Sequence, residues 1–216
     1  MKKTGVYIDG YNLYYGMLKG TPYKWLELEK LIRSMIKADH DLVFIKYFTA
    51  PIKTYPYDAA ALERQNLYLQ AIATNPKIQT ILGYYAKHTG WLPAHADECK
   101  QCSITRYGMV PVMRLEEKRS DVNIAVSMLV DATRSDIESF ILVTGDSDQV
   151  GSIEALRYVY RKSVIVLNPQ SGLSEHLKRA ASYYQNIPRD LPAHCQLPDE
   201  LPIGTHGRMI HRPPTW

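Results

Sequence analysis

Two carboxylates separated by one residue, Asp146 and Asp148, are the side chains of this chain best placed to do chemistry. They follow residues 140–143 (FILV), which have the length and composition of a short buried strand. An apolar segment then resumes and runs with helical character over residues 150–160. The acidic pair is therefore predicted to lie just beyond the carboxyl end of a strand, which is where open α/β sheets bind ligands.

Such a pair predicts a metal site, because close carboxylates repel one another and a divalent cation offsets that repulsion. The simpler interpretation is that one of the two aspartates caps the following helix while the other is solvated. This stretch alone favours neither interpretation, so the other acids of the chain have to be placed.

A third acid, Asp9, occupies the same kind of position at the end of a predicted strand over residues 6–8. Asn12 lies one helical turn further on and could bond a water or a phosphate oxygen, or cap the turn. Tyr11, Tyr14 and Tyr15 stand beside Asp9 and could stack bases, although core packing explains most of the 16 tyrosines.

A fourth acid, Asp121, begins a predicted helix for which Ser120 is the expected N-cap. The helical spacing places Asp121 on the same side as the apolar face and aims it inward, where a carboxylate needs a partner or a metal. The helix dipole is the alternative source of stabilisation. Asp131 lies off this face and is predicted to be structural or solvated. The apolar face consists of Ile124, Ala125, Met128, Leu129 and Ala132.

The elements that must position these acids alternate along the chain, which predicts a parallel sheet with right-handed crossovers. Strands are expected over residues 6–8, 42–48, 78–85, 140–143 and 163–167. Helices are expected over residues 26–36, 58–74, 121–130, 153–160 and 174–181, the last capped by Ser174.

Residues 86–115 interrupt this alternation and predict an inserted β-hairpin with a knuckle at its Cys-x-x-Cys pair. Cys99 and Cys102, with His88 and His95, could hold zinc, which takes four ligands in a structural site. The spacing is not that of a standard finger, so a reduced surface turn without metal is the alternative.

Composition and charge limit the class of protein. The 216 residues contain no apolar run of membrane-spanning length and no disulfide framework among three cysteines, so a cytoplasmic location is expected. Residues 116–154 hold nine acids and three bases, a net −6, which leaves +10 on the rest. An acidic centre in a basic frame suits a metal site that handles a polyanion, although chance clustering of surface charge also produces it.

We expect one domain over residues 1–187 and a proline-rich tail over 188–216 that packs on it or trails from it.

Four motifs in this order, YIDGYNLYYG, EEKRSDVNIAVSMLVDA, ILVTGDSDQV and SVIVLNP, resemble the NYN-domain family of PIN-like nuclease relatives. The resemblance implies a Rossmann-like, three-layer fold with a mainly parallel sheet of about five strands flanked by helices. It also implies a metal site made by Asp9, Asn12, Asp121, Asp146 and Asp148. Ser127 stands where many relatives have an aspartate, and Gln149 and Gly151 also depart from the family pattern.

These observations together predict a Mg²⁺- or Mn²⁺-dependent ribonuclease in which Asp9, Asp121, Asp146 and Asp148 hold the metal and activate water. Asn12, Lys118, Thr144 and Ser147 are the residues expected to bind the substrate, while Arg119 is expected to be solvated. An RNA- or nucleotide-binding module with a structural metal, and a phosphatase acting on small phosphates, are the alternatives. No membrane partner is expected, and a homo-oligomer is left open.

Overall fold

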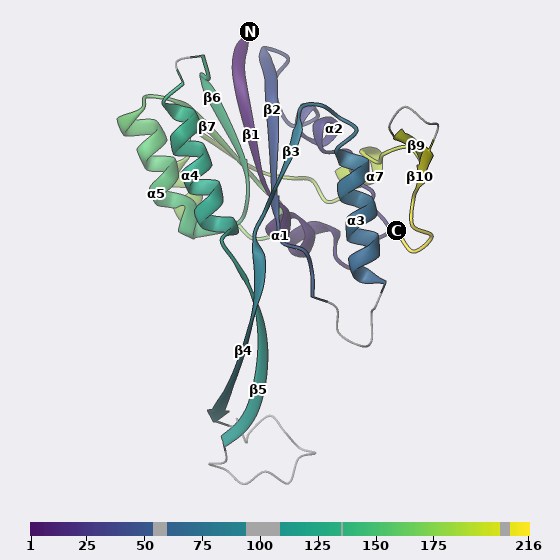
Figure 1. Cartoon of the computed structure of the whole chain (residues 1–216). Coiled ribbons are helices and arrows are strands. Elements are labelled where there is room, and N and C mark those ends of the chain that lie inside the picture. Colours follow the sequence, from purple (N-terminus) through teal and green to yellow (C-terminus); the bar gives the residue numbers. More distant parts are fainter. Residues whose placement is uncertain (54–59, 94–108, 135, 204–207) are drawn as a thin grey trace.

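The computed structural model of the chain describes residues 1–53, 60–93, 109–134, 136–203 and 208–216. The centre of this described part is a six-stranded parallel sheet with the strand order β3-β2-β1-β6-β7-β8 (Figure 1). The α/β class predicted from the sequence is therefore confirmed. The sixth strand was not predicted, because its four residues YYQN carry no apolar run. The strands are β1 (Lys2–Asp9), β2 (His40–Thr49), β3 (Ile78–Leu82), β6 (Ser139–Val143), β7 (Ser163–Asn168) and β8 (Tyr183–Asn186).

The helices cover both faces of the sheet and so form three layers (Figure 1). One face is covered by α1 (Gly10–Leu13), the π-helical turn η1 (Tyr14–Leu18), α2 (Leu28–Arg33) and α3 (Ala61–Ile72). The other is covered by α4 (Ser120–Ala132), by α5 (Val150–Glu154) with its π-helical continuation η3 (Ala155–Val159), and by α6 (Glu175–Ala180).

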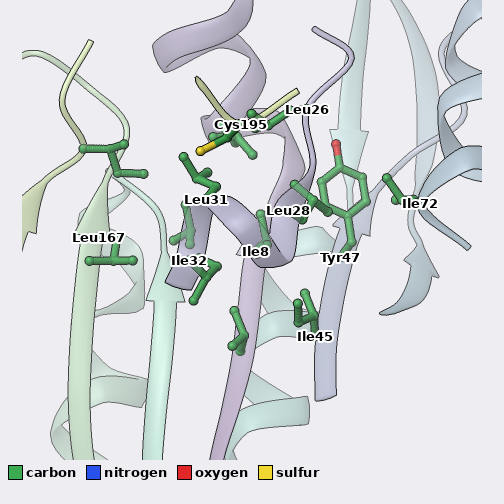
Figure 2. Packing of buried hydrophobic residues seen from close by; sticks show 14 of the residues in the cluster. Ile8, Leu26, Leu28, Leu31, Ile32, Ile45, Tyr47, Ile72, Leu167 and Cys195 are labelled. Carbon is green, nitrogen blue, oxygen red and sulfur yellow. The ribbon is translucent and has the colours of Figure 1, made fainter. Parts of the chain in front are cut away.

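The period of two in β1 explains why both cores form. Val6 and Ile8 are fully buried in the core beneath α2 and α3, whereas Tyr7 between them is fully buried in the core beneath α4 and α5. Figure 2 shows Ile8 packed with Leu31 and Ile32 in the first of these cores. Each fully buried aliphatic side chain stabilises the fold by roughly 1.5–3 kcal/mol. A one-residue slip of β1 would turn each of these side chains toward the opposite core, so the packing of both cores specifies the register.

At the ends of α4 one prediction was wrong and one was confirmed. Ser120 is not the N-cap, because the chain enters the helix through Arg119 in a left-handed conformation (φ 80°) and the Ser120 hydroxyl instead donates to Glu117 Oε1. Of the two roles predicted for Asp131, structural or solvated, the structure shows the first, because the residue is buried. Its Oδ2 accepts hydrogen bonds from the Tyr7 hydroxyl (2.7 Å) and from Lys46 Nζ (2.5 Å).

The other helix boundaries differ from the expected ranges by a few residues, as α2 and α3 show. Part of the predicted 58–74 helix, at residues 58 and 59, lies outside the described residues. The N-cap predicted for α6 is present, since the Ser174 side chain accepts from the backbone of Leu177.

The inserted segment forms an antiparallel hairpin of β4 (Tyr84–Pro93) and β5 (Met109–Lys118) that extends away from the sheet (Figure 1). It begins and ends a few residues outside the predicted 86–115 range. Cys99, Cys102 and His95 lie outside the described residues, so zinc binding stays a prediction. His88 is exposed on β4, with its Nε2 4.0 Å from Glu116 Oε2.

The chain beyond residue 187 lies against the α2 and α3 layer. Trp25 Nε1 donates to the carbonyl of Pro198 (2.8 Å), and the Trp216 ring lies 6.0 Å from that of Tyr68. The described elements of this segment are α7 (Leu191–His194), β9 (Glu200–Ile203) and β10 (Arg208–His211). The domain boundary predicted at 187/188 stays a prediction. None of the helices described here is both long enough and apolar enough to pass through a membrane.

Candidate metal centre

The predicted acids gather at the point where the strand order reverses. Strands β2 and β3 follow β1 on one side of the sheet, and β7 and β8 follow β6 on the other. The carboxyl ends of β1 and β6 lie side by side, with Ile8 opposite Val143. Ligands of open α/β sheets bind at such a switch point. A glycine follows each strand, and a side chain at Gly10 would lie 2.6 Å from the Phe48 carbonyl oxygen. The backbone therefore approaches its neighbours more closely here than other residues allow.

Asp9 is the last residue of β1 and is 1% exposed. Its Oδ1 accepts from the backbone N–H of Asn12 (2.9 Å), and its Oδ2 accepts from Asn12 Nδ2 (2.7 Å) and from Thr144 Oγ1 (3.1 Å). Burial raises the pKa of Asp9, and the Asn12 bonds oppose that rise. The carboxylate is thus fixed in one orientation by hydrogen bonds from α1 and from the loop after β6.

Asn12 positions Asp9, and its predicted role in substrate binding stays a prediction. Besides its donation to Asp9, its Oδ1 accepts from the backbone N–H of Gly145 (3.3 Å) and from Gln170 Nε2 (2.9 Å). Asn12 therefore links the ends of β1, β6 and β7. The sequence left open that Asn12 caps this turn. The N-cap of α1 is Asp9, whose side chain accepts from the backbone N–H of Asn12.

Asp146 caps the short 3₁₀ helix Ser147–Gln149, since its Oδ1 accepts from the backbone N–H of Asp148 (3.0 Å). Its own N–H donates to Thr144 Oγ1 (3.1 Å), the same oxygen that donates to Asp9. Ser147 and Asp148 are exposed. The capping interpretation is therefore correct for Asp146, but a cap engages only one of its two oxygens and leaves the other available.

Asp121 lies in the first turn of α4, on the rim of this cluster. The residue is exposed, yet its carboxyl group is partly shielded from water. That burial, followed by the negative charges of Asp9, Asp146, Glu117 and Asp148, raises the pKa of Asp121 to about 6. The inward orientation predicted for Asp121 holds only in part, because the buried face of α4 starts at Ile124.

Two residues that sequence reasoning left out of the site take part in this arrangement. Glu117, near the end of β5, accepts from Ser120 and adds to the charge that acts on Asp121. Gln149 is 2% exposed and donates from Nε2 to the Asp121 carbonyl (3.1 Å), which ties the loop after β6 to the start of α4. Two features of the sequence could have identified them: an acid lies four residues before Asp121, and Gln149 departs from the aromatic or apolar residue that the family resemblance implies there.

A divalent cation requires oxygen donors that are not already neutralised. No ion pair joins Asp9, Asp121, Asp146 or Asp148 to a basic side chain within the described part of the chain. Among those same residues, no three His, Cys, Asp or Glu side chains are close enough to hold an ion together as they stand. Mg²⁺ commonly uses one or two carboxylates and keeps several waters, so the oxygen donors present fit such an open site.

The basic residues predicted near the site are already engaged. Lys118 Nζ lies 2.7 Å from Glu116 Oε2 in a half-exposed ion pair, and Arg119 places its guanidinium 4.8 Å from the centre of the Tyr84 ring. Lys118 could bind a phosphate only if this surface ion pair opened, which costs little because water screens exposed pairs.

A pocket of about 710 Å³ opens on the α1 side of Asp9. Gly10 and Tyr11 line it directly after Asp9, and the negative charge of Asp9 adds to the burial that raises the pKa of Tyr47 in its wall. Sequence reasoning identified Tyr11 and its neighbours, but not the pocket, because its other walls come from α3, β4 and the C-terminus.

A Rossmann-like α/β domain with clustered carboxylates at its switch point is the class of protein that this fold and this site define. The family model of the NYN domain matches residues 3–188, so the chain belongs to the NYN domain family. It is 29% identical, over 231 aligned residues, to 6-hydroxy-3-succinoylpyridine 3-monooxygenase HspA of Pseudomonas putida, covering 93% of this chain and 72% of that protein. The crystal structure of a protein of unknown function from Vibrio parahaemolyticus shares the fold, with a TM-score of 0.54, 18% identity, and coverage of 88% of this chain and 94% of that one.

Proposed function

We propose that this chain is a Mg²⁺- or Mn²⁺-dependent ribonuclease that hydrolyses phosphodiester bonds of RNA. The observation that carries the proposal is the concentration of negative charge at the switch point. Partial burial and four neighbouring carboxylates raise the pKa of Asp121 to about 6, and no basic residue within the described part of the chain neutralises this cluster of aspartates by an ion pair. Membership of the NYN domain family supports the same interpretation of the site.

Asp9 and Asp146 would hold the ion, with Asp121 and Asp148 binding it directly or through water. A divalent ion bound there supplies an activated water and stabilises negative charge on the phosphate. Asn12 and Thr144 hold the Asp9 carboxylate in one orientation, as the hydrogen bonds to both of its oxygens support. The exposed Ser147 hydroxyl and Lys118 would contact phosphates of the substrate.

The direct test is turnover of a labelled single-stranded RNA with Mn²⁺ for the variants Asp9→Asn and Asp146→Asn. Each should lower the rate at least about a hundredfold, because the metal site loses a charged ligand. Asp41→Asn, an exposed residue at the amino end of β2, is the matched control and should keep the wild-type rate. Near wild-type turnover by pure Asp9→Asn and Asp146→Asn proteins would refute the proposal. Hydrolysis that does not depend on substrate length would indicate the phosphatase alternative.

A binding module without catalysis is the second candidate. The observation in its favour is that, among the described residues, no three candidate ligands already converge on one point. It predicts RNA binding in EDTA that Mn²⁺ strengthens without any product appearing.

The name of the Pseudomonas putida relative suggests a third candidate, a reaction on a small aromatic compound. The aromatic pocket beside Asp9 would suit such a compound. Conversion of 6-hydroxy-3-succinoylpyridine by the wild-type protein, supplied with O₂ and a two-electron reductant and measured by loss of substrate absorbance, tests that candidate.

We also propose a cytoplasmic location, on the composition described above, which cell fractionation would test. Whether the chain forms a homo-oligomer is open to measurement by light scattering.

A further inference from the structure

The pocket beside Asp9 has walls of two chemical kinds. Seven aromatic side chains of the described residues line it, among them Tyr11, Tyr47, Tyr85 and Trp216. Tyr11 and Tyr15 lie with their ring centres 4.4 Å apart at its α1 edge. Flat aromatic walls provide stacking surfaces that accept any base, because every base has a π-face.

One wall residue, Tyr47, offers a hydroxyl that a ligand can use. Tyr47 is 8% exposed, and its hydroxyl makes no hydrogen bond with the described residues. Figure 2 shows this hydroxyl pointing away from Ile45, toward the end of the sheet where α1 begins. A hydroxyl in the wall of the pocket can donate a hydrogen bond to, or accept one from, a polar edge of a ligand bound there.

The second kind of wall is basic. Lys24, Lys53 and Arg64 all line the pocket. Burial and the nearby positive charge of Arg64 lower the pKa of Lys24. No ion pair joins Lys24 or Lys53 to an acid within the ranges that the structure describes. Positive charge therefore collects in the pocket while negative charge collects around Asp9, which suits a ligand with an anionic group beside an aromatic ring.

We propose that this pocket takes the unpaired base and an adjacent phosphate of one nucleotide of a single-stranded RNA, next to the bond that is cut. The base lies among the tyrosines, its polar edge meets the Tyr47 hydroxyl, and the phosphate is held by Lys24 and Arg64. A base enclosed by protein rings has left its pairing partner, so duplex RNA does not fit. The assignment rests on the proposed nuclease function for the position of the cut, whereas the binding itself needs neither metal nor turnover.

The experiment measures binding in EDTA, where no hydrolysis occurs. A fluorescein-labelled octa-adenylate is titrated with the protein by anisotropy, as a single strand and as a duplex with its complement, and AMP is added as a competitor. The single strand should bind at least about tenfold more tightly than the duplex, and AMP should displace it. Stacking and phosphate contacts make this difference measurable.

Variants locate the binding in the pocket. Lys24→Gln and Tyr47→Phe should each weaken single-strand binding about threefold to tenfold, since each removes one contact. Lys37→Gln, an exposed lysine outside the pocket, is the matched control and should bind like the wild type. Thermal unfolding of both variants checks that they fold. Tyr47→Phe keeps the ring and so serves as the test if Lys24→Gln does not fold.

The outcomes separate the pocket from the nuclease. Equal binding of duplex and single strand, or wild-type affinity in both variants, refutes base binding in the pocket even if RNA turnover is present. Loss of binding in both variants supports it even if the wild type shows no turnover, in which case only the nuclease proposal fails. Displacement of the oligonucleotide by 6-hydroxy-3-succinoylpyridine but not by AMP would also overturn it and assign the pocket to small aromatic acids.

Discussion

Removing one charge from the acidic cluster should make the metal-free protein more stable. The change is Asp121→Asn, because Asp121 is the residue on which the charges of Asp9, Asp146, Glu117 and Asp148 act together. Its pKa of about 6 in the folded protein exceeds its ordinary value of 3.8, so the ionised form is penalised by folding. Most substitutions destabilise, which makes a gain in stability an informative result.

The size of the gain follows from that shift. Full conversion of a rise of about two pKa units corresponds to about 3 kcal/mol. The residue is exposed, so screening by water leaves roughly a third to a half of this, about 1–1.5 kcal/mol. Loss of a negative charge from the first turn of α4 subtracts about 0.3–1 kcal/mol. The expected net gain at pH 8 is therefore about 0.5 kcal/mol.

The pH dependence is the sharper part of the prediction. Since the folded pKa lies above the unfolded one, the folded wild type binds the proton more tightly between pH 4 and 6, and it becomes more stable as the pH falls through that window. The substituted amide does not titrate, so the advantage of the variant should be complete above pH 7 and should disappear by pH 4. Asp41→Asn, away from the cluster, should show no such trend.

The assay is urea unfolding in EDTA at pH 8, 6 and 4.5, repeated at pH 8 with Mn²⁺. At one hundred times the dissociation constant, Mn²⁺ should stabilise the wild type by about 2.7 kcal/mol, and the variant by less. A variant that is less stable than wild type at every pH, and that responds equally to Mn²⁺, would show that the acids do not act on one another as described.

The remaining predictions concern single contacts. Lys118→Ala should raise the KM for RNA and make that KM less dependent on salt, because one phosphate contact is lost. An unchanged salt dependence would show that Lys118 pairs with Glu116 and does not contact the RNA. Asp131→Ala should destabilise the fold by about 3–5 kcal/mol in urea unfolding, because it leaves Lys46 largely buried without its anion, and a loss below about 1 kcal/mol would contradict this. If Cys99 and Cys102 bind zinc, elemental analysis should find about one zinc per chain, and Cys99→Ser should lose it. Absence of zinc from protein expressed with zinc supplied would refute zinc binding by this segment.

The sequence determined the alternation of strands and helices and the placing of Asp9 and Asp146 at strand ends. Each of these depends on residues close in the chain: an apolar run such as 140–143, a helical period such as that of α4, and the residue that follows. Parallel strands then have their carboxyl ends at one edge, so two acids that end strands could be expected at the same edge without knowledge of the packing.

Only the tertiary structure decided which of these groups act on one another. Three contacts depend on residues far apart in the chain: Thr144 donates to Asp9, Gln149 donates to the Asp121 carbonyl, and Asp131 is buried against Lys46. The short strand β8 also escaped prediction, because four polar and aromatic residues pair only when β7 is already beside them. The pocket is the clearest case: its walls come from α1, β2, α3, β4 and the last residue of the chain, and a surface assembled from segments so far apart has no signal in local sequence.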